Sequence, residues 1–173
     1  MKLPVRTVQV LAALLVLGVG LAYADGSGDP KAASSDDGQY ADANGIPTFH
    51  IENGKVDWYT YVGYLRYGAN CLQCHGPDGL GSSYAPSLVD SLKTLSYPQF
   101  LATVAQGKKN VSASSDLVMP TFGENKNVMC YITAIYVYLR ARADGSMGRG
   151  RPQEHEPRPA SYSKAEDQCM GPT

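Results

Sequence analysis

The sequence is short of the residues on which several protein classes depend. Its 173 residues include three His, four Cys and one Trp. It has no internal repeat and no twin-arginine pair, and its 15 Lys and Arg nearly balance its 16 Asp and Glu without forming a dense basic run. The missing basic run argues against a nucleic-acid partner. The length suits one domain with one modest core.

Long hydrophobic runs are also scarce, and the one that exists lies at the start of the chain. Lys2 and Arg6 precede an apolar run over residues 8–21, which is shorter than the ~20 residues of a membrane span. Small residues up to Ala24 then form a cleavage site, so residues 1–24 are predicted to be a signal peptide. We expect export to the periplasm, with no membrane span in the mature form. The alternative is an uncleaved N-terminal anchor.

The rest of the chain divides by composition into three parts. Residues 25–48 are rich in Gly, Ser, Ala and Asp, and such a segment buries too little apolar surface to offset its ordering entropy. They are predicted to form a flexible acidic leader. A compact domain is expected over residues 49–144. Residues 145–173 turn to Gly, Pro, Arg and Glu, and are predicted to form an extended C-terminal tail.

Three main helices are predicted inside the compact domain, at about residues 56–71, 98–107 and 127–143. Apolar residues recur in each at spacings of three and four, which places them on one face. Ser96 and Gln99 form a capping-box pattern at the start of the second helix. No convincing run of alternating strand residues is present. The prediction is therefore an all-α domain.

The stretch "CLQCH" carries the chemistry, and several kinds of site contain two cysteines and a histidine at such spacing. A zinc site needs about four ligands, and Cys130 and Cys169 do not form a second close pair. A redox dithiol would follow a strand, where helices are predicted instead. A disulfide between Cys71 and Cys74 leaves His75 without a role. Covalent haem attachment uses all three residues, because both thiols bond the porphyrin and the imidazole ligates its iron.

The residues after the motif fit a chain that turns along a large flat group. Gly76, Gly79 and Gly81 can adopt backbone conformations closed to other residues, so the chain can turn tightly there. Further on, the backbone carbonyl of Pro86 can accept the second ring N–H of His75 and fix the orientation of the imidazole. An ordinary surface turn and a loop proline are the plainer interpretations.

A six-coordinate haem iron needs a second protein ligand. His50 lies in the predicted leader and His155 in the predicted tail, and both are expected to face water. Met119 lies in a predicted loop beside Pro120, which stiffens the backbone that would present the sulfur. Met129, inside the third predicted helix, is the rival and fits core packing better. We therefore favour Met119, with an open sixth site as a further possibility.

At this point the sequence resembles the class I c-type cytochromes. The resemblance runs from the aromatic first helix through "CLQCHGPDGLG", "APSL" and "VMP" to "YITAIYVYLRA". It implies a cytochrome c-like fold of three main helices and loops around one covalent haem c. It carries over thioether bonds from Cys71 and Cys74 and iron ligation by His75 and Met119, with Pro86 behind His75.

The longer stretches "KVDWYTYVGYLRYGANCLQCHGPDGLGSSYAPSL" and "VMPTFGENKNVMCYITAIYVYLRARADG" look like the four-cysteine c-type cytochromes of methanol metabolism, similar in role to cytochrome cL. This resemblance implies an electron carrier, not an enzyme, that is reduced by a PQQ-dependent methanol dehydrogenase of the lanthanide-using kind. A downstream cytochrome or oxidase would be the acceptor, and the carrier would be a monomer. The alternatives are a haem peroxidase or ligand-binding haem protein with an exchangeable sixth ligand, and a haem subunit of a dehydrogenase complex.

The four-cysteine resemblance also bears on the two remaining cysteines. It suggests a disulfide between Cys130 and Cys169 in an oxidising periplasm. Closing a loop of about 40 residues would stabilise the fold by roughly 4 kcal/mol in the chain-entropy model. Two free thiols are the alternative. With the bond, the tail would be fixed to the domain.

The surroundings of the haem are expected to be apolar, and its partners to dock weakly and partly through charge. The predicted pocket residues are Trp58, Tyr61, Leu88, Phe100 and the apolar stripe of the third helix. The predicted docking rim consists of Lys93, Lys108, Lys109 and Lys126.

Overall fold

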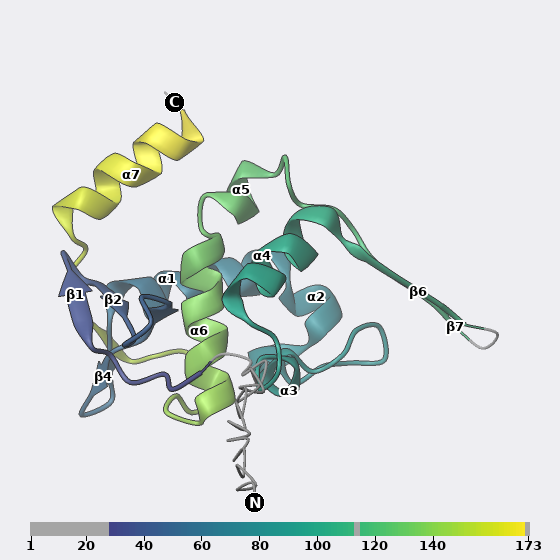
Figure 1. Cartoon of the computed structure of the whole chain (residues 1–173), viewed down its shortest axis with the longest axis horizontal. Helices are drawn as coiled ribbons and strands as arrows, with labels where there is room; N and C mark the ends of the chain where they lie inside the picture. The colour runs from purple at the N-terminus through teal and green to yellow at the C-terminus, as the bar shows by residue number, and fades with distance from the viewer. Residues whose placement is uncertain (1–27, 113–114, 172–173) are drawn as a thin grey trace, which may run out of the picture.

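A computed structural model describes residues 28–112 and 115–171. Three helices form the body of the molecule (Figure 1), and the first and last of them cross. They are α1 (Trp58–Asn70), α4 (Tyr97–Gln106) and α6 (Ile132–Asp144). Shorter helical elements connect or follow them: α2 (Leu72–His75), a 3₁₀ turn (Pro77–Gly79), α3 (Leu88–Ser91), α5 (Lys126–Met129) and α7 (Ala160–Met170).

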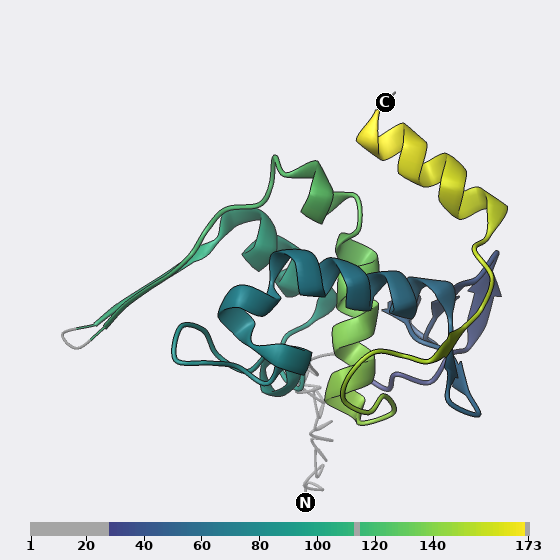
Figure 2. The same ribbon diagram turned by 180° about the vertical axis from the view of Figure 1, so that it is seen from behind.

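Short strands also occur, which corrects the all-α prediction. Two three-stranded sheets lie beside the helices: β1 (Ser34–Asp36), β2 (Gln39–Ala41) and β3 (Pro47–Thr48) form one, and β4 (Ile51–Glu52), β5 (Lys55–Val56) and β8 (Glu154–His155) form the other. A hairpin of β6 (Lys108–Ser112) and β7 (Ser115–Met119) projects from the body (Figure 2). The small sheets have strands of only two or three residues, too short to give a readable alternating pattern.

The three predicted helices are present with adjusted ends. Asp57 caps α1, since its carboxylate accepts hydrogen bonds from the backbone N–H of Thr60 at 2.8 Å and from that of His50 at 2.8 Å. The capping box of α4 is confirmed, because Gln99 Oε1 accepts from the backbone N–H of Ser96 at 2.9 Å. The third predicted helix is broken into α5 and α6.

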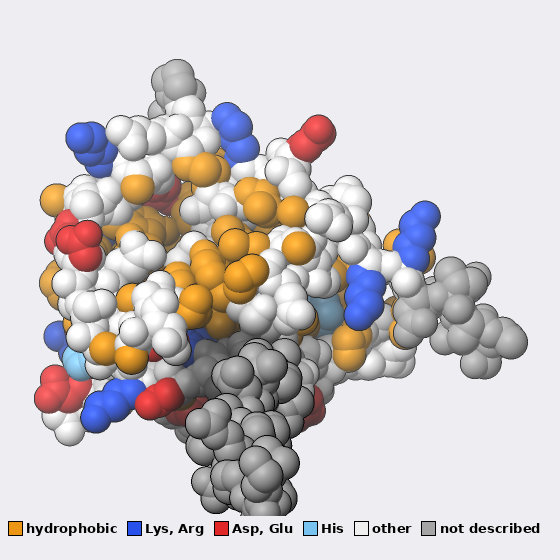
Figure 3. Space-filling model, viewed as in Figure 1, with side chains coloured by type: hydrophobic (Ala, Val, Ile, Leu, Met, Phe, Trp, Pro, Cys, Tyr) orange, Lys and Arg blue, Asp and Glu red, His pale blue; other side chains and the backbone are white. Residues whose placement is uncertain are grey.

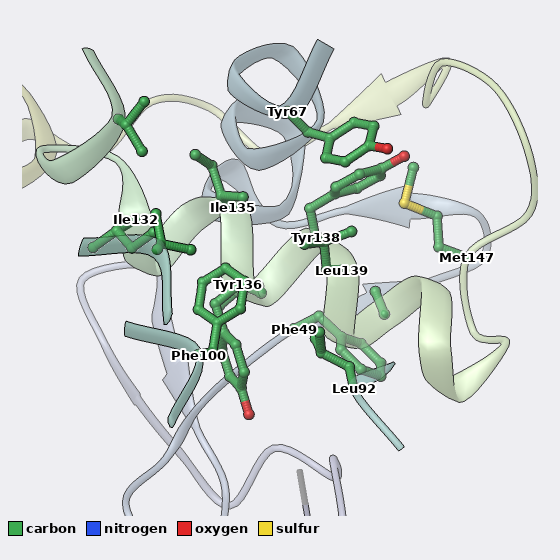
Figure 4. Packing of buried hydrophobic residues seen from close by; sticks show 14 residues of the cluster. Phe49, Tyr67, Leu92, Phe100, Ile132, Ile135, Tyr136, Tyr138, Leu139 and Met147 are labelled. Atoms are coloured by element: carbon green, nitrogen blue, oxygen red, sulfur yellow. The ribbon is translucent and has the colours of Figure 1, made fainter. Parts of the chain in front are cut away.

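The crossing of α1 and α6 is closer than side chains allow. A Cβ atom placed on Gly63 would lie 1.9 Å from the carbonyl oxygen of Ala134, in the backbone of α6. Gly63 therefore lets the two helix backbones touch. Figure 4 shows side chains of α6 in the core, with Tyr138 beside Tyr67 and Tyr136 beside Phe100.

The segment predicted as a flexible leader is structured over most of its length. Strands β1 to β3 fold back on one another, and a buried ion pair ties them to α6: Arg140 donates to the Asp42 carboxylate at 2.7 Å and to the carbonyl of Pro47 at 3.0 Å. The side chains of Arg140 and Asp42 are 0% and 2% exposed. Composition alone predicted a flexible segment because Arg140, the partner that orders it, lies about 100 residues away in sequence.

The predicted extended tail is likewise folded. It contains β8, which pairs with β5 in parallel, and α7, whose Tyr162 is buried. A disulfide joins Cys130 to Cys169 near the end of α7. The predicted signal peptide, residues 1–24, lies outside the described residues. Within the described part of the chain, no helix has the length and apolar character needed to cross a bilayer.

Replacing Gly63 by Ala is expected to lower the free energy of unfolding by about 2–3 kcal/mol, because the new methyl group would push α1 off α6. Guanidinium unfolding followed by circular dichroism measures this loss. Gly68→Ala is the matched control in the same helix, since a Cβ at Gly68 meets nothing within 4 Å. The control should be neutral or stabilising by up to ~1 kcal/mol. Equal effects of the two changes would contradict the backbone contact.

The Asp42 ion pair predicts a pH-dependent contribution to stability. Burial alone would raise the pKa of Asp42, but hydrogen bonds from Arg140 and from the backbone of Ile46 and Asn44 bring it below its usual value. A depressed pKa stabilises the fold above the unfolded pKa of about 3.9, and this stabilisation is lost as the pH falls through the folded value.

Asp42→Asn should therefore cost about 3–5 kcal/mol at pH 7, where the buried guanidinium loses its counter-charge. The gap to the wild type should narrow below about pH 4, where Asp42 takes up a proton in the unfolded chain first and in the folded protein at lower pH. Asp90→Asn, which removes an exposed pair with Lys93, should change stability little. Denaturant unfolding at several pH values checks this, and a gap independent of pH would argue against the ion pair.

Candidate functional site

The "CLQCH" motif forms a single helical turn at the end of α1. Cys71 ends α1, its backbone N–H donating to the carbonyl of Tyr67 at 2.9 Å, and His75 ends α2, its backbone N–H donating to the carbonyl of Cys71 at 2.9 Å. Cys71 and Cys74 are not bonded to each other, which sets aside the simple disulfide. Burial, followed by the charge of the neighbouring Cys74, raises the pKa of the Cys71 thiol to about 11.

His75 is buried, with 8% of its surface exposed, and one ring nitrogen has a hydrogen-bond partner in the backbone. Its Nδ1 lies 2.9 Å from the backbone carbonyl oxygen of Pro86. Because a carbonyl only accepts, Nδ1 carries the proton and Nε2 is the nitrogen with a free lone pair. This is the arrangement expected for an imidazole that ligates a metal through Nε2.

The loop after His75 turns too tightly for side chains. Gly76 has φ of 73°, and a Cβ placed on it would lie 2.2 Å from the carbonyl oxygen of Gly81. The hydroxyl of Tyr67 donates to the carbonyl of Gly76 at 2.5 Å, and the backbone N–H of Gly81 donates to the carbonyl of His75 at 2.8 Å. Positive φ at Gly76, Gly79 and Gly81 confirms the expectation of unusual backbone conformations there.

An apolar cavity opens beside the motif. Cys71, His75 and Met119 all lie in its wall, and the rest of the lining comes from α3, α4, α5, α6 and the loops between them. The other lining residues are Leu88, Leu95, Phe100, Thr103, Val104, Phe122, Val128, Ile132, Ile135 and Leu139. Figure 3 shows hydrophobic side chains gathered in the middle of the face on which α4 and α6 lie.

The residues of this cavity fit a covalently held haem. A porphyrin needs an apolar slot, a thiol at its edge and iron ligands that point inward, and one cavity here has Cys71, His75 and Met119 in its wall. Nitrogen and sulfur ligands also suit iron better than hard cations. Within the described residues, no cluster of three or more His, Cys, Asp or Glu could hold another metal.

Met119 is presented by the base of the β6–β7 hairpin, which corrects the predicted plain loop. It pairs in register with Lys108, next to Gly107 at the end of α4. Beyond it, the chain is fixed to the end of α4, since the backbone N–H of Phe122 donates to the carbonyl of Val104 at 3.1 Å. The rival Met129 does not line the cavity and packs against the core.

Some predicted pocket residues lie elsewhere. Leu88, Phe100 and apolar residues of α6 line the cavity as expected, but Trp58 and Tyr61 do not. Trp58 packs edge-on against Tyr162 of α7, and Tyr61 stacks on His155 at 3.9 Å between ring centroids. Both therefore cover the C-terminal segment, whose folded structure was not predicted. His155 is consequently a packed residue, and His50 stacks on Tyr40 at 4.6 Å.

Two further residues hold the motif and carried no readable signal in the sequence. Tyr67 supports Gly76, as described above. Asp78 is buried and accepts hydrogen bonds from the backbone N–H of Gly150 at 2.8 Å and from Arg149 Nε at 3.0 Å. Although burial would raise the pKa of Asp78, these two hydrogen bonds lower it below its usual value. The motif is thereby tied to a segment about 70 residues away, which spacing alone cannot reveal.

Comparison with known proteins agrees with this geometry. Residues 62–139 match the family described as cytochrome c oxidase, cbb3-type, subunit III. The chain is 50% identical to cytochrome c-553I of Paracoccus denitrificans over 136 residues, which are 78% of this chain and 60% of that protein. It is 38% identical to cytochrome c-555 of Methylococcus capsulatus over 99 residues, 57% of this chain and 74% of that protein.

A solved structure is also similar. The crystal structure of the c-type cytochrome XoxG from Methylobacterium extorquens AM1 superposes with a TM-score of 0.76 at 56% identity, over 81% of this chain and 86% of that one. The chain therefore belongs to the c-type cytochromes, and like them it carries covalently bound haem c. It spans 60% of the length of the Paracoccus relative.

Proposed function

We propose that this chain is a periplasmic electron carrier with one haem c, and that it has no substrate chemistry of its own. The main support is the apolar cavity. Cys71 and His75 of the attachment motif and Met119 are more than 40 residues apart in sequence, yet they line the same cavity. Haem iron with two protein ligands supplies reversible one-electron transfer. A haem peroxidase or ligand-binding protein would instead keep the sixth position exchangeable.

We propose one role for each residue of the site, and the geometry supports these roles. Cys71 and Cys74 form the thioether bonds, and His75 ligates iron through Nε2 while Pro86 orients its ring. Met119, which lines the same cavity, would supply the second iron ligand. A thioether is a soft, neutral donor that favours ferrous iron, so it raises the reduction potential relative to a second imidazole. The apolar lining limits water near the iron, which acts in the same direction.

Met119→Ala is expected to abolish the methionine-to-iron charge-transfer band of the ferric protein and to lower the midpoint potential, because water or an added ligand would take the sixth position. Visible spectroscopy and redox titration measure both effects. Met129→Leu is the control, since Met129 packs against the core outside the cavity lining, and it should leave both readouts in place. An unchanged spectrum in Met119→Ala would contradict the ligand assignment and favour an exchangeable site.

The proposed electron donor is a PQQ-dependent methanol dehydrogenase of the lanthanide-using kind, with a downstream cytochrome or oxidase as acceptor. The support is the resemblance of two long stretches, around the motif and from Met119 into α6, to the four-cysteine cytochromes of methanol metabolism. The similarity to XoxG and to cytochrome c-553I extends over about four fifths of the chain. The carrier is proposed to act as a monomer.

The surface around the motif supports transient docking there. The large hydrophobic side chains that are exposed in the described residues lie mainly beside the site: Leu72 within the motif, Leu80 and Tyr84 after it, and Val118 next to Met119. Isolated exposed hydrophobic residues are ordinary, but several around one redox centre suit a small, partly apolar interface. Electrons would then enter and leave near the exposed Cys74.

Of the four lysines predicted to form the docking rim, two have partners within the chain. Lys93 pairs with Asp90 at 2.7 Å, and Lys126 donates to the carbonyl of Met170 at 3.1 Å. Lys108 and Lys109 are exposed at the base of the hairpin, close to Met119. We therefore retain Lys108 and Lys109 as the part of the docking rim that steers an acidic partner.

Stopped-flow absorbance tests the donor. Ferric protein mixed with PQQ methanol dehydrogenase from the same source and methanol should be reduced rapidly, and more slowly at high salt. Lys108→Gln/Lys109→Gln should slow reduction roughly three- to tenfold at low salt, with the difference shrinking at high salt.

Lys31→Gln/Lys164→Gln, which removes the same charge from exposed positions near β1 and on α7, should have little effect. A sample that dithionite reduces but methanol dehydrogenase does not would remove the methanol assignment and leave the cytochrome intact.

A further inference from the structure

Helix α7 stands at the end of the molecule opposite the β6–β7 hairpin and returns toward α5 (Figures 1 and 2). Most of its side chains are exposed or only partly buried, and Tyr162 is its one buried residue. A helix with so little core of its own is held in place by specific attachments. Tyr162, near its start, packs against Trp58 and Tyr59 of α1, and the attachments of its C-terminal half lie at the junction between α5 and α6.

The strongest attachments fix the two ends of α5. The disulfide joins Cys169 of α7 to Cys130, the residue that ends α5. At the start of α5, Lys126 Nζ donates to the carbonyl of Met170 at 3.1 Å. The C-terminal end of α7 therefore spans the whole of α5.

A third attachment links the same junction to α1. The hydroxyl of Tyr131 donates to the carboxylate of Glu166 in α7, and Arg66 of α1 lies 3.5 Å from the same carboxylate. The guanidinium of Arg66 also lies 3.5 Å from the centre of the Tyr131 ring. Tyr131 is thus held between α1 and α7.

The junction is a bend in the wall of the haem cavity. Tyr131 has φ of −121° and ψ of 9°, outside the helical region, so α5 and α6 are not one rigid rod. Val128 and Ile132, one on each side of the bend, both line the cavity. The wall that contains Met119 and Phe122 therefore continues into the break between α5 and α6 at Cys130 and Tyr131.

We propose that α7 is a clamp that holds this wall closed and thereby positions Met119 on the haem. The inference rests on the proposed ligation by Met119. The disulfide and the Lys126 bond prevent α5 from rotating about the bend. Without them the wall opens more often, Met119 leaves iron more often, and water reaches the pocket. The clamp residues Cys130, Cys169 and Lys126 are positioning residues, because none of them lines the cavity.

Ligand exchange measures the clamp directly. Carbon monoxide at saturating concentration binds ferrous haem only as fast as methionine leaves, so its binding rate reports Met119 dissociation. Cys130→Ser/Cys169→Ser should raise this rate about tenfold, which corresponds to ~1.4 kcal/mol. It should also lower the midpoint potential. Lys126→Met, which keeps the disulfide, should give a smaller increase of about two- to threefold, following the loss of one hydrogen bond.

Thr48→Val is the control for general destabilisation. The buried Thr48 hydroxyl donates to the carbonyl of Pro30 at 2.5 Å, in the N-terminal sheet and away from the bend. This variant should lose stability without changing the carbon monoxide rate. Unchanged rates in both clamp variants, or an equal increase in Thr48→Val, would overturn the proposal.

If the double variant does not assemble, the disulfide of the assembled wild type can be reduced with a phosphine, which leaves thioether bonds intact, and the same rate increase is expected. The ligation by Met119 is tested by a different measurement, the ferric absorption spectrum of the wild type. If that spectrum lacks the methionine-to-iron band, Met119 ligation is refuted, whatever the carbon monoxide rates show for the clamp. Neither readout uses a methanol dehydrogenase, so a failure of the donor assignment is also distinguishable.

Discussion

At Gly63 the backbone of α1 lies against the backbone of α6, with no side chain between them. This contact sets where the haem site forms. It fixes the direction in which α1 ends, and α1 ends at Cys71, the first residue of the attachment motif. It also brings the Ile135 and Leu139 face of α6 to the cavity that Cys71 and His75 border. A side chain at position 63 would separate the motif from the wall it needs.

The two sides of the cavity are held by different physical means. On the His75 side, the contacts are mostly local: the carbonyl of Pro86 orients the ring, and Tyr67 fixes the carbonyl of Gly76. Arg142, from the end of α6, adds a hydrogen bond to the carbonyl of Asp78 at 3.3 Å. Several neighbouring contacts therefore fix the orientation of the His75 ring. Met119 lies at the base of the β6–β7 hairpin, and the cavity wall continues from there into α5, to which the distant α7 is attached.

This difference explains how far the sequence could predict the structure. The attachment motif, the three helices and the glycine turn are local patterns, and Gln99 forms its capping box as its position implied. The strands could not be predicted. The small ones have only two or three residues, and the sequence of the β6–β7 hairpin shows no clear alternation of polar and apolar residues. The order of residues 34–48 depends on Arg140, which follows them by about 100 residues, and the order of residues 154–170 on β5 and Cys130.

The same logic applies to individual site residues. Leu88 and Phe100 could be predicted as pocket residues because they are apolar and follow the motif, but Trp58 and Tyr61 were equally apolar and turn away toward Tyr162 and His155. Hydrophobicity predicts burial and does not say which partner covers a residue. Only the C-terminal segment, which no periodic pattern identifies, decides the direction of these two side chains.

A carrier that exchanges electrons repeatedly gains from keeping both iron ligands in both oxidation states, because any ligand change would add reorganisation to each transfer. The ring of His75, the proposed ligand in the motif, is held by the carbonyl of Pro86, 11 residues further along the chain. Met119 lies at the base of a projecting hairpin, so under the proposed ligation its position depends on segments outside the attachment motif. The folded C-terminal segment, with Glu166 between Arg66 and Tyr131 and Cys169 bonded to Cys130, is placed to support that position. On this proposal, residues 154–170 would support the redox site mechanically without supplying either of the two proposed ligands.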